Sequence, residues 1–241
     1  MFSPEGPSLR ELAVQALSSV EHGYDLLAPK FDHTPFRTPD PLLDAVAAML
    51  RRVGTFDDGL DLCCGTGAGV EALTKVCRAS VTGVDFSTGM LEVARERVPS
   101  GGPRVSWVRG DARALPFAPA FDLVVSFGAF GHFLPRELPG LFGQVHSVLR
   151  PGGCFAFPVV APPRPASPAY WMLSGFDAVM KARNALWRPP FVMYYRDFRL
   201  GLVLPELERA GFAVDLYALP EFGPRADGSP RVRMVAARRL P

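Results

Sequence analysis

Residues 60–69 read LDLCCGTGAG, an apolar stretch that leads into a loop with glycine at Gly65, Gly67 and Gly69. Glycine takes φ values that other side chains forbid, and it lets the backbone pass close to a ligand. The amides that open a helix after such a loop favour a negatively charged ligand group. The stretch therefore predicts a strand, a ligand-binding turn and a helix, in that order.

The adjacent cysteines of this loop suggest a second interpretation, a thiol reaction centre. A reactive thiolate needs a lowered pKa, and no basic residue stands beside Cys63 or Cys64 in the sequence. A disulfide between chain neighbours is strained. We therefore expect both to be small core residues, and a plain tight turn without a ligand is the remaining alternative.

Apolar runs of strand length alternate with stretches of helical period after residue 60. The predicted strands are Leu60–Cys64, Val81–Asp85, Val105–Arg109, Phe121–Phe127 and Cys154–Ala161. The predicted helices between them are Val70–Ala79, Thr88–Val98 and Pro135–Leu149. Strands that are apolar throughout indicate a parallel sheet covered on both faces, and right-handed crossovers make it doubly wound.

The two ends of the chain differ from this alternation. Apolar positions at helical spacing predict a helix within residues 8–28, and a second helix follows Pro41. Near the other end, the runs Phe212–Pro220 and Arg231–Leu240 are joined by a turn-rich link and predict an antiparallel pair. Residues 162–200 are rich in aromatic side chains and predict a lid.

These patterns predict one α/β domain with a mostly parallel seven-stranded sheet, an antiparallel last strand and an inserted helical lid. Its parts are an N-terminal helical cover (1–55), a core (56–161), the lid (162–200), and a final helix with the strand pair (201–241).

Composition limits the classes of function. The chain has 241 residues, 48% of them hydrophobic, which suits one substantial core. Lys and Arg total 26 against 24 for Asp and Glu, so no basic surface for nucleic acid is expected. The four histidines and four cysteines are dispersed and predict neither a metal site nor a disulfide framework. No secretory signal and no membrane span is recognisable, which predicts a cytoplasmic protein.

Three acidic residues fall on three neighbouring predicted strands. Asp85 ends the second strand and is placed to accept hydrogen bonds from ribose hydroxyls. Asp61 lies inside a buried strand, where a charge is costly unless it faces a cationic or donor group. Asp111 is placed to accept from an exocyclic amine such as that of adenine. A dinucleotide loop starting at Gly65 would need glycine where Val70 stands, so this loop is one residue tighter.

Five motifs in this order resemble the class I S-adenosylmethionine-dependent methyltransferases: LDLCCGTGAG, VTGVDFSTGML, VRGDARALPF, FDLVVSFGAFGHF and VLRPGGCFAF. The resemblance runs from about Leu60 to Phe157 and implies a Rossmann-like methyltransferase fold that converts S-adenosylmethionine to S-adenosylhomocysteine. One departure is that the family has glycine where Cys63 stands, for which we expect altered packing and retained binding.

The resemblance also implies roles for individual residues. It places Asp61 near the methionine amine, Asp85 on the ribose hydroxyls, Asp111 with Ala112 at the adenine, and Phe86 and Met90 along the adenine pocket. The full cofactor-binding set is Tyr24, Arg37, Asp61, Cys63, Gly65, Thr66, Gly67, Asp85, Phe86, Met90, Gly110, Asp111, Ala112, Ser126, Phe127 and Gly128.

The segment YDLLAPKFD (Tyr24–Asp32) resembles an element found before the core in ubiquinone and menaquinone-type methyltransferases. In those proteins the tyrosine and the region around Arg37 help to close over the cofactor. Tyr24 as a simple packing residue is the alternative.

His132 lies in FGAFGHF, after the fourth predicted strand, where the methyl group is presented. It is either a general base that removes an acceptor proton or a hydrogen-bonded wall residue. The run Ser126-Phe127-Gly128 lacks the Asn/Asp-Pro-Pro-aromatic motif of relatives that methylate amino-nucleobases and glutamine. We therefore expect in-line transfer to a small, partly apolar acceptor by a monomer or homodimer. The alternatives are an NAD(P)-dependent oxidoreductase and a non-catalytic S-adenosylmethionine-binding protein.

Overall fold

A sheet of seven strands forms the centre of the protein, in the order β3-β2-β1-β4-β5-β7-β6. It is seen in a computed structural model that describes residues 5–99, 101–165, 167–194 and 198–240. The strands are β1 (Phe56–Leu62), β2 (Cys77–Asp85), β3 (Arg104–Arg109), β4 (Phe121–Val125), β5 (Leu149–Val160), β6 (Phe212–Ala218) and β7 (Val232–Arg239).

The pairing of the strands confirms the predicted topology. Strands β1 to β5 pair in parallel with one another, and β7 is antiparallel to both β5 and β6. The order of the parallel strands reverses between β1 and β4, and in open α/β sheets ligands bind at such a switch point. The fold is the doubly wound α/β fold expected from the sequence.

Helices connect and cover the strands. The α-helices are α1 (Leu9–Leu17), α2 (Val20–Leu27), α3 (Asp40–Val53), α4 (Ala68–Thr74), α5 (Thr88–Arg97), α6 (Leu138–Val148), α7 (Pro168–Leu186) and α8 (Leu200–Arg209). Short 3₁₀ helices are η1 (Ala28–His33), η2 (Ala129–His132), η3 (Pro135–Glu137) and η4 (Pro220–Phe222).

Two predicted helices were wrong in extent. The single helix expected within residues 8–28 is two helices, because Ser18 ends α1 and Ser19 caps α2 by accepting a hydrogen bond from the His22 amide. The helix expected to reach Ala79 ends at Thr74, since the chain already enters β2 at Cys77.

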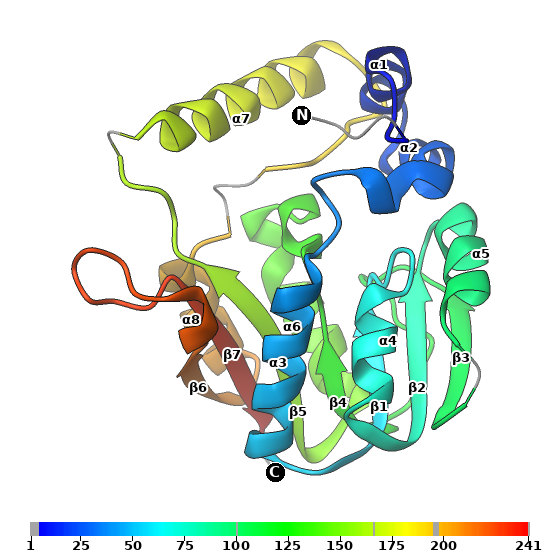
Figure 1. Cartoon of the computed structure of the whole chain (residues 1–241), viewed down its shortest axis with the longest axis vertical. Coiled ribbons are helices and arrows are strands. Elements are labelled where there is room, and N and C mark those ends of the chain that lie inside the picture. Colours follow the sequence, from blue (N-terminus) through cyan, green and yellow to red (C-terminus); the bar gives the residue numbers. More distant parts are fainter. Residues whose placement is uncertain (1–4, 100, 166, 195–197, 241) are drawn as a thin grey trace.

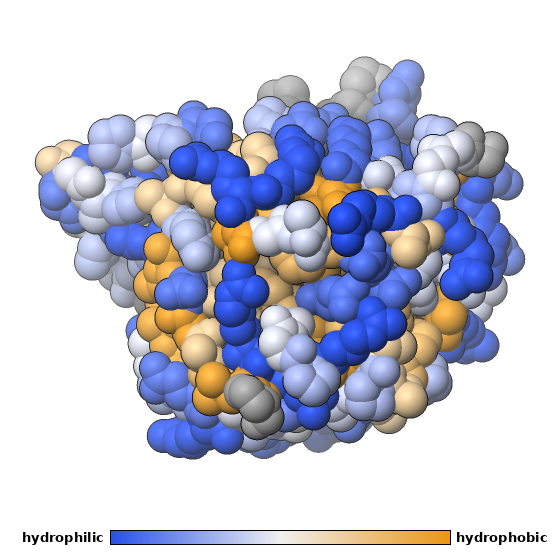
Figure 2. Space-filling view, turned by 90° about the horizontal axis from the view of Figure 1, so that it is seen from below, coloured by the Kyte–Doolittle hydropathy of each residue, from blue (hydrophilic) through white to orange (hydrophobic). Residues whose placement is uncertain are grey.

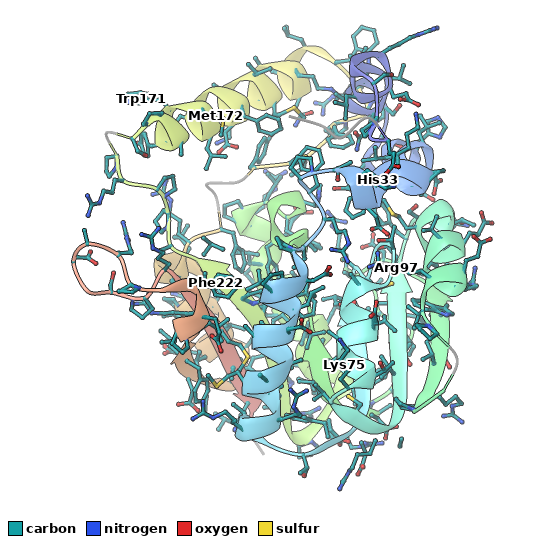
Figure 3. The ribbon with its side chains drawn as sticks, viewed as in Figure 1. His33, Lys75, Arg97, Trp171, Met172 and Phe222 are labelled. Carbon is teal, nitrogen blue, oxygen red and sulfur yellow. The ribbon has the colours of Figure 1, made fainter. Side chains whose placement is uncertain are left out.

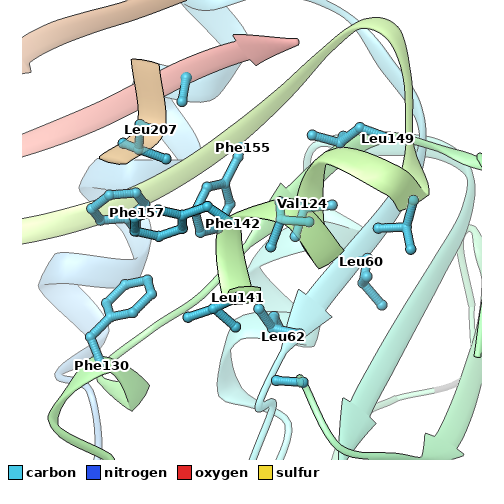
Figure 4. Close-up of a cluster of buried hydrophobic side chains, with 14 of the residues drawn as sticks. Leu60, Leu62, Val124, Phe130, Leu141, Phe142, Leu149, Phe155, Phe157 and Leu207 are labelled. Carbon is cyan, nitrogen blue, oxygen red and sulfur yellow. The ribbon is translucent and has the colours of Figure 1, made fainter. Parts of the chain in front are cut away.

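The sheet separates two hydrophobic cores. On one face α6 and α8 pack against the sheet through residues such as Phe142, Phe155, Phe157 and Leu207, which are fully buried and meet in Figure 4. On the other face α3, α4 and α5 cover the strands through a second cluster that includes Val46. A sheet buried on both faces requires strands that are apolar throughout, as the sequence predicted.

The carboxyl ends of the parallel strands point to the end of the molecule that carries α1, α2 and α7 (Figure 1). At the opposite end, hydrophilic side chains cover much of the surface, with apolar residues visible between them (Figure 2). Residues 166 and 195–197 of the expected lid lie outside the described residues, and α7 is the helix of that segment. Within the described residues, no helix is long and apolar enough to cross a membrane.

Candidate functional site

The glycine loop between β1 and α4 is tightly folded. Cys63 is a non-glycine residue with a positive φ, +59°, and Gly65 and Gly67 also have positive φ, +51° and +85°. At Gly69 a Cβ atom would lie 2.3 Å from Oδ2 of Asp61 and 2.6 Å from the Phe127 ring. The loop therefore needs glycine at Gly69 for close approach, whereas it holds Cys63 in a conformation that favours glycine.

A cavity of about 610 Å³ opens at the carboxyl ends of β1, β2, β3 and β4. Most of the residues predicted from the sequence line it: Tyr24, Cys63, Gly65, Asp85, Phe86, Met90, Gly110, Asp111, Ala112, Phe127, Gly128 and His132. These residues come from the cover and from the loops after four strands, so the switch point brings them together.

A second cavity of about 60 Å³ adjoins the first and is lined by Arg37, Asp61 and Thr66. Both cavities share lining residues, among them Cys63 and Gly65, so the smaller one is a side chamber of the larger. The chamber thus carries one basic and one acidic side chain.

Two predicted cofactor residues line neither cavity. Ser126 is fully buried, and its hydroxyl donates to the Leu62 carbonyl at 2.9 Å, which ties the end of β1 to the end of β4. A Cβ at Gly67 would lie 3.0 Å from Trp107, because this glycine faces the packed side of α5 and β3. Both positions support the loop from behind, and their assignment to cofactor binding stays a prediction.

Asp85 is buried and fixed by backbone amides. Its Oδ2 accepts from the amide of Gly65 and its Oδ1 from the amide of Ser87, both at 2.9 Å. Burial raises the pKa of Asp85, and these amide hydrogen bonds oppose the rise. The carboxylate therefore joins the glycine loop to the start of α5 and borders the cavity at the position expected for a ribose partner.

Asp61, in β1, is a carboxyl group buried away from water. It is 1% exposed, and its Oδ1 has no hydrogen-bond partner among the described residues. Burial and the charge of Asp85 raise the pKa of Asp61 well above its ordinary value, although the Val70 amide donates to it. A buried carboxylate oxygen without a partner is costly, and a cation in the side chamber would satisfy it.

Asp111 lies at the rim of the large cavity. Its Oδ1 accepts from the backbone amide of Arg113 at 2.9 Å, and the Arg113 guanidinium lies 3.4 Å away. Arg113 also donates to Glu137 at 3.0 Å and stacks over the Phe133 ring at 4.9 Å. Arg113 thus braces the rim, a role that sequence reasoning missed although the residue stands in the quoted motif VRGDARALPF.

His132 and Tyr24 are hydrogen-bonded across the cavity wall. The Nε2 atom of His132 lies 2.7 Å from the Tyr24 hydroxyl, and Nδ1 lies 2.7 Å from the carbonyl of Val192. A carbonyl only accepts, so Nδ1 carries the proton, and Nε2 of the neutral ring accepts from Tyr24. Burial lowers the pKa of His132, and the Arg113 charge adds to this effect, so the ring is neutral near pH 7.

Two aspartates of the segment Tyr24–Asp32 fasten the cover to the core, and neither was identified from the sequence. Asp25 accepts from the Ser87 hydroxyl at 2.6 Å and from the Gly89 amide at 3.0 Å. Asp32 accepts from the Thr66 hydroxyl at 2.6 Å. It also pairs with Arg97, which projects from α5 toward the cover in Figure 3. The signal was present in the motif, whose second and last positions are these aspartates.

The cysteines of the loop are unsuited to thiol chemistry. Burial raises the pKa of Cys63 and of Cys64 well above the ordinary value, and the neighbouring carboxylates add to this rise. Both thiols therefore stay protonated, as expected for small packing residues. Among the described residues, no group of three or more His, Cys, Asp or Glu side chains is arranged to hold a metal ion.

Part of this chain is similar in sequence to known methyltransferases. Residues 60–153 match the family described as methyltransferase domain. An uncharacterized methyltransferase of Synechocystis sp. is 38% identical over 113 residues, which are 46% of this chain and 50% of that protein. The demethylmenaquinone methyltransferase of Staphylococcus aureus is 44% identical over 98 residues, which are 39% of each chain. The chain thus spans half or less of the length of these relatives.

Among solved structures, a SAM-dependent methyltransferase from Methanosarcina mazei superposes with a TM-score of 0.59 and 19% identity, over 78% of this chain and 94% of that one. At this identity the likeness concerns the fold, and it extends beyond the segment matched by sequence.

Proposed function

We propose that this protein, whose residues 60–153 match the methyltransferase domain family, transfers a methyl group from S-adenosylmethionine to a small, partly apolar acceptor. The observation that carries the proposal is the buried Oδ1 of Asp61, which lacks a partner among the described residues and borders a chamber next to the glycine loop. A dinucleotide would leave this oxygen unexplained.

The residues present fit S-adenosylmethionine. Its amino-acid end carries an ammonium and a carboxylate, and the side chamber offers Asp61 and Arg37 to these two charges. Asp85 borders the adjoining large cavity as a ribose partner, and Met90 and Ala112 supply apolar surface for the adenine. A cavity of about 610 Å³ leaves room for an acceptor beside the cofactor, since ligand pockets commonly measure about 300–1,000 Å³.

The acceptor side of the cavity is mainly apolar. Its lining includes Phe130, Phe133, Val159, Met193 and Phe198, and Phe130 and Phe198 stack with their ring centroids 4.2 Å apart. Such a wall suits a flat, partly apolar molecule. The name of the S. aureus relative, demethylmenaquinone methyltransferase, supports a quinone-type or phenol-type acceptor.

When bound, S-adenosylmethionine supplies a methyl group that is already activated on its sulfonium. The chain then has to orient the acceptor, exclude water and take up any acceptor proton. We assign orientation to the aromatic wall and water exclusion to the cover, which Asp25 and Asp32 hold against the core. Positioning of this kind contributes about 7–11 kcal/mol in favourable cases.

For an acceptor that carries a proton, His132 is the proposed base. Tyr24 lines the cavity, and its hydroxyl donates to Nε2 of His132. As the acceptor gives its proton to the Tyr24 oxygen, the Tyr24 proton moves to Nε2, and the Val192 carbonyl holds the resulting imidazolium at Nδ1. The lowered pKa of His132 keeps Nε2 free of a proton before this step.

A thermal-shift comparison with S-adenosylmethionine, S-adenosylhomocysteine, NAD and NADP tests the proposal. Ligand at a hundredfold excess over its dissociation constant stabilises a protein by about 2.7 kcal/mol, which raises the Tm of a chain of this size by roughly 5–10 °C. We expect a shift with the two adenosyl sulfur compounds alone. A shift with NAD or NADP alone would contradict the proposal, and a screen of phenols and quinone precursors would follow the expected result.

A further inference from the structure

Helix α7 (Pro168–Leu186) has an apolar face that no part of the described chain covers. Trp171, Met172, Val179 and Leu186 are 66%, 68%, 66% and 87% exposed. At 100° per residue these positions fall on one side of the helix, together with exposed Gly175, Ala178, Ala182 and Ala185. Figures 1 and 3 show α7 along the outside of the molecule, with Trp171 and Met172 near its first turn.

The other side of α7 is buried. Met180 packs with Phe191, Met193 and Tyr194, and Phe176 adds to the same cluster. A helix that is apolar on both sides is normally covered on both sides. The outer face of α7 is therefore an incomplete interface, and its size over five turns exceeds the scattered apolar residues of ordinary surfaces.

The exposed charges at the two ends of α7 are of one sign. Arg164 before the helix and Arg188 after it are exposed, and Asp177, the only carboxylate in the sequence of residues 161–190, is buried. Lys181 lies over the Tyr194 ring, 5.1 Å from its centroid, on the buried side of the helix. On the neighbouring helices, Glu11 is paired with Lys30 and Glu21 with Arg109.

A two-fold contact between two copies would set these cations against each other. An anionic lipid surface complements both the apolar face and its basic rim. We infer that the outer face of α7 docks on the surface of a bilayer that contains anionic lipid, with the helix lying in the headgroup region.

The position of α7 links this surface to the large cavity. Met193 and Tyr194 touch the buried side of α7 and also line the cavity, and Val160, 63% exposed, lies on the same lining. A docked protein would thus hold the apolar side of its cavity one helix away from the lipid. The inference concerns binding alone and does not rest on the proposed activity.

Vesicle flotation with the full chain and no cofactor tests the inference. Vesicles of phosphatidylcholine with phosphatidylglycerol are compared with vesicles of phosphatidylcholine alone, at low and high salt. We expect flotation with the anionic vesicles, and weaker flotation at high salt because screening weakens attraction to charged lipid. Leu186→Glu and Trp171→Glu should each lower the bound fraction about tenfold, because each removes a large exposed apolar side chain from the face.

A matched control is Leu202→Glu, which puts the same change on an exposed leucine of α8, 49% exposed, and should float like the unmodified protein. The charge component is tested by Arg164→Gln combined with Arg188→Gln, which should lower flotation with retained Tm. Absence of flotation, or equal loss in Leu202→Glu, would overturn the inference. So would a light-scattering mass that falls from dimer to monomer in Leu186→Glu without any lipid binding, because the face would then belong to a second copy.

Discussion

At the scale of single residues, the site is organised by carboxyl groups that the fold keeps away from water. Asp85 is compensated by two backbone amides, whereas Asp61 keeps one oxygen without a partner among the described residues. Such a group lowers the stability of the ligand-free protein and favours binding of a cation. A substitution that removes the carboxyl group of Asp61 is therefore expected to raise the stability of the protein and to lower its affinity for the cofactor.

We predict that Asp61→Asn stabilises the ligand-free protein and weakens binding of S-adenosylmethionine. Burial raises the pKa of Asp61, so keeping this carboxyl group in the folded chain costs free energy that the neutral amide does not, about 1–3 kcal/mol in stability. The amide also loses the attraction for the ammonium group, about 10- to 100-fold in affinity. Urea unfolding measures the first effect and isothermal titration the second. Unchanged affinity would contradict the assignment of Asp61 to the ammonium.

The raised pKa values of Asp61 and Asp85 predict how stability depends on pH. Both carboxyls keep a proton in the folded chain at pH values above 3.8, where they ionise when unfolded. The folded state therefore binds more protons in this window, and the contribution of these groups to stability falls as pH rises. Urea unfolding of Asp61→Asn between about pH 4.5 and pH 7 should show a less negative slope than the unmodified protein. An identical slope would contradict the raised pKa.

For His132 we predict that His132→Gln lowers kcat about 10²-fold or more toward a protonated acceptor and leaves S-adenosylmethionine affinity unchanged. In the unmodified protein the fall of kcat at low pH should lie below 6.5, the ordinary histidine pKa, because burial lowers the pKa at which Nε2 of His132 takes up a proton. The control is His146→Gln on α6, a histidine that lines neither cavity and whose pKa is also lowered by burial. An unaltered pH profile of kcat in His132→Gln would contradict the role of His132 as a base and leave it as a hydrogen-bonded residue of the cavity wall.

At the scale of elements, the contact between α2 and α5 holds the N-terminal helices beside the cavity. Asp25 on α2 accepts from Ser87 and Gly89 at the start of α5. The two helices approach so closely there that a Cβ on Gly89 would lie 3.1 Å from the Asp25 carbonyl oxygen. The glycine is thus part of the cover contact.

We predict that Gly89→Ala destabilises the protein by about 1–3 kcal/mol and weakens cofactor binding, because α2 has to move away from α5. The matched control is Gly143→Ala in α6, where a Cβ meets no atom within 4 Å. That change should stabilise the protein by about 0.5–1 kcal/mol, since alanine is the better helix former. The urea midpoint and a titration with S-adenosylmethionine measure both. Equal stability changes in the two variants would contradict the close contact.

At the scale of the whole molecule, three separate segments enclose one cavity. The core contributes Asp85, the cover Tyr24, and the segment after α7 Val192 and Met193. They are held together by contacts between residues far apart in sequence, such as that of His132 with Tyr24 and Val192. Cofactor binding should therefore reduce local opening in all three segments.

Hydrogen exchange measures this coupling. We expect S-adenosylmethionine to slow amide exchange in residues 24–37 and 190–194 as well as in the glycine loop 60–69. Strand β7 (Val232–Arg239) borders neither cavity and serves as the internal control with unchanged exchange. Protection limited to the glycine loop would show that the cover and the segment after α7 do not respond to the cofactor.

Several features could be predicted from the sequence because they depend on local pattern. The apolar runs predicted all seven strands, and the order of strands and helices predicted the parallel pairing and the switch point. The spacing from Gly65 to Asp85 predicted a carboxylate beside the loop, and their hydrogen bond of 2.9 Å confirms the proximity. The division of the helix in residues 8–28 was missed, because Ser18 and Ser19 do not interrupt the helical spacing of the apolar residues, although they form the end of α1 and the cap of α2.

The sequence by itself determined the fold class, the glycine loop and the residue types around it, because hydrophobic period and glycine spacing act within one segment. Only the tertiary structure decided that Asp61 opens on a side chamber with Arg37, that Ser126 turns away from the cavity, and that Tyr24 meets His132. These facts depend on which side chains from distant segments face each other, and packing of the complete chain sets that direction.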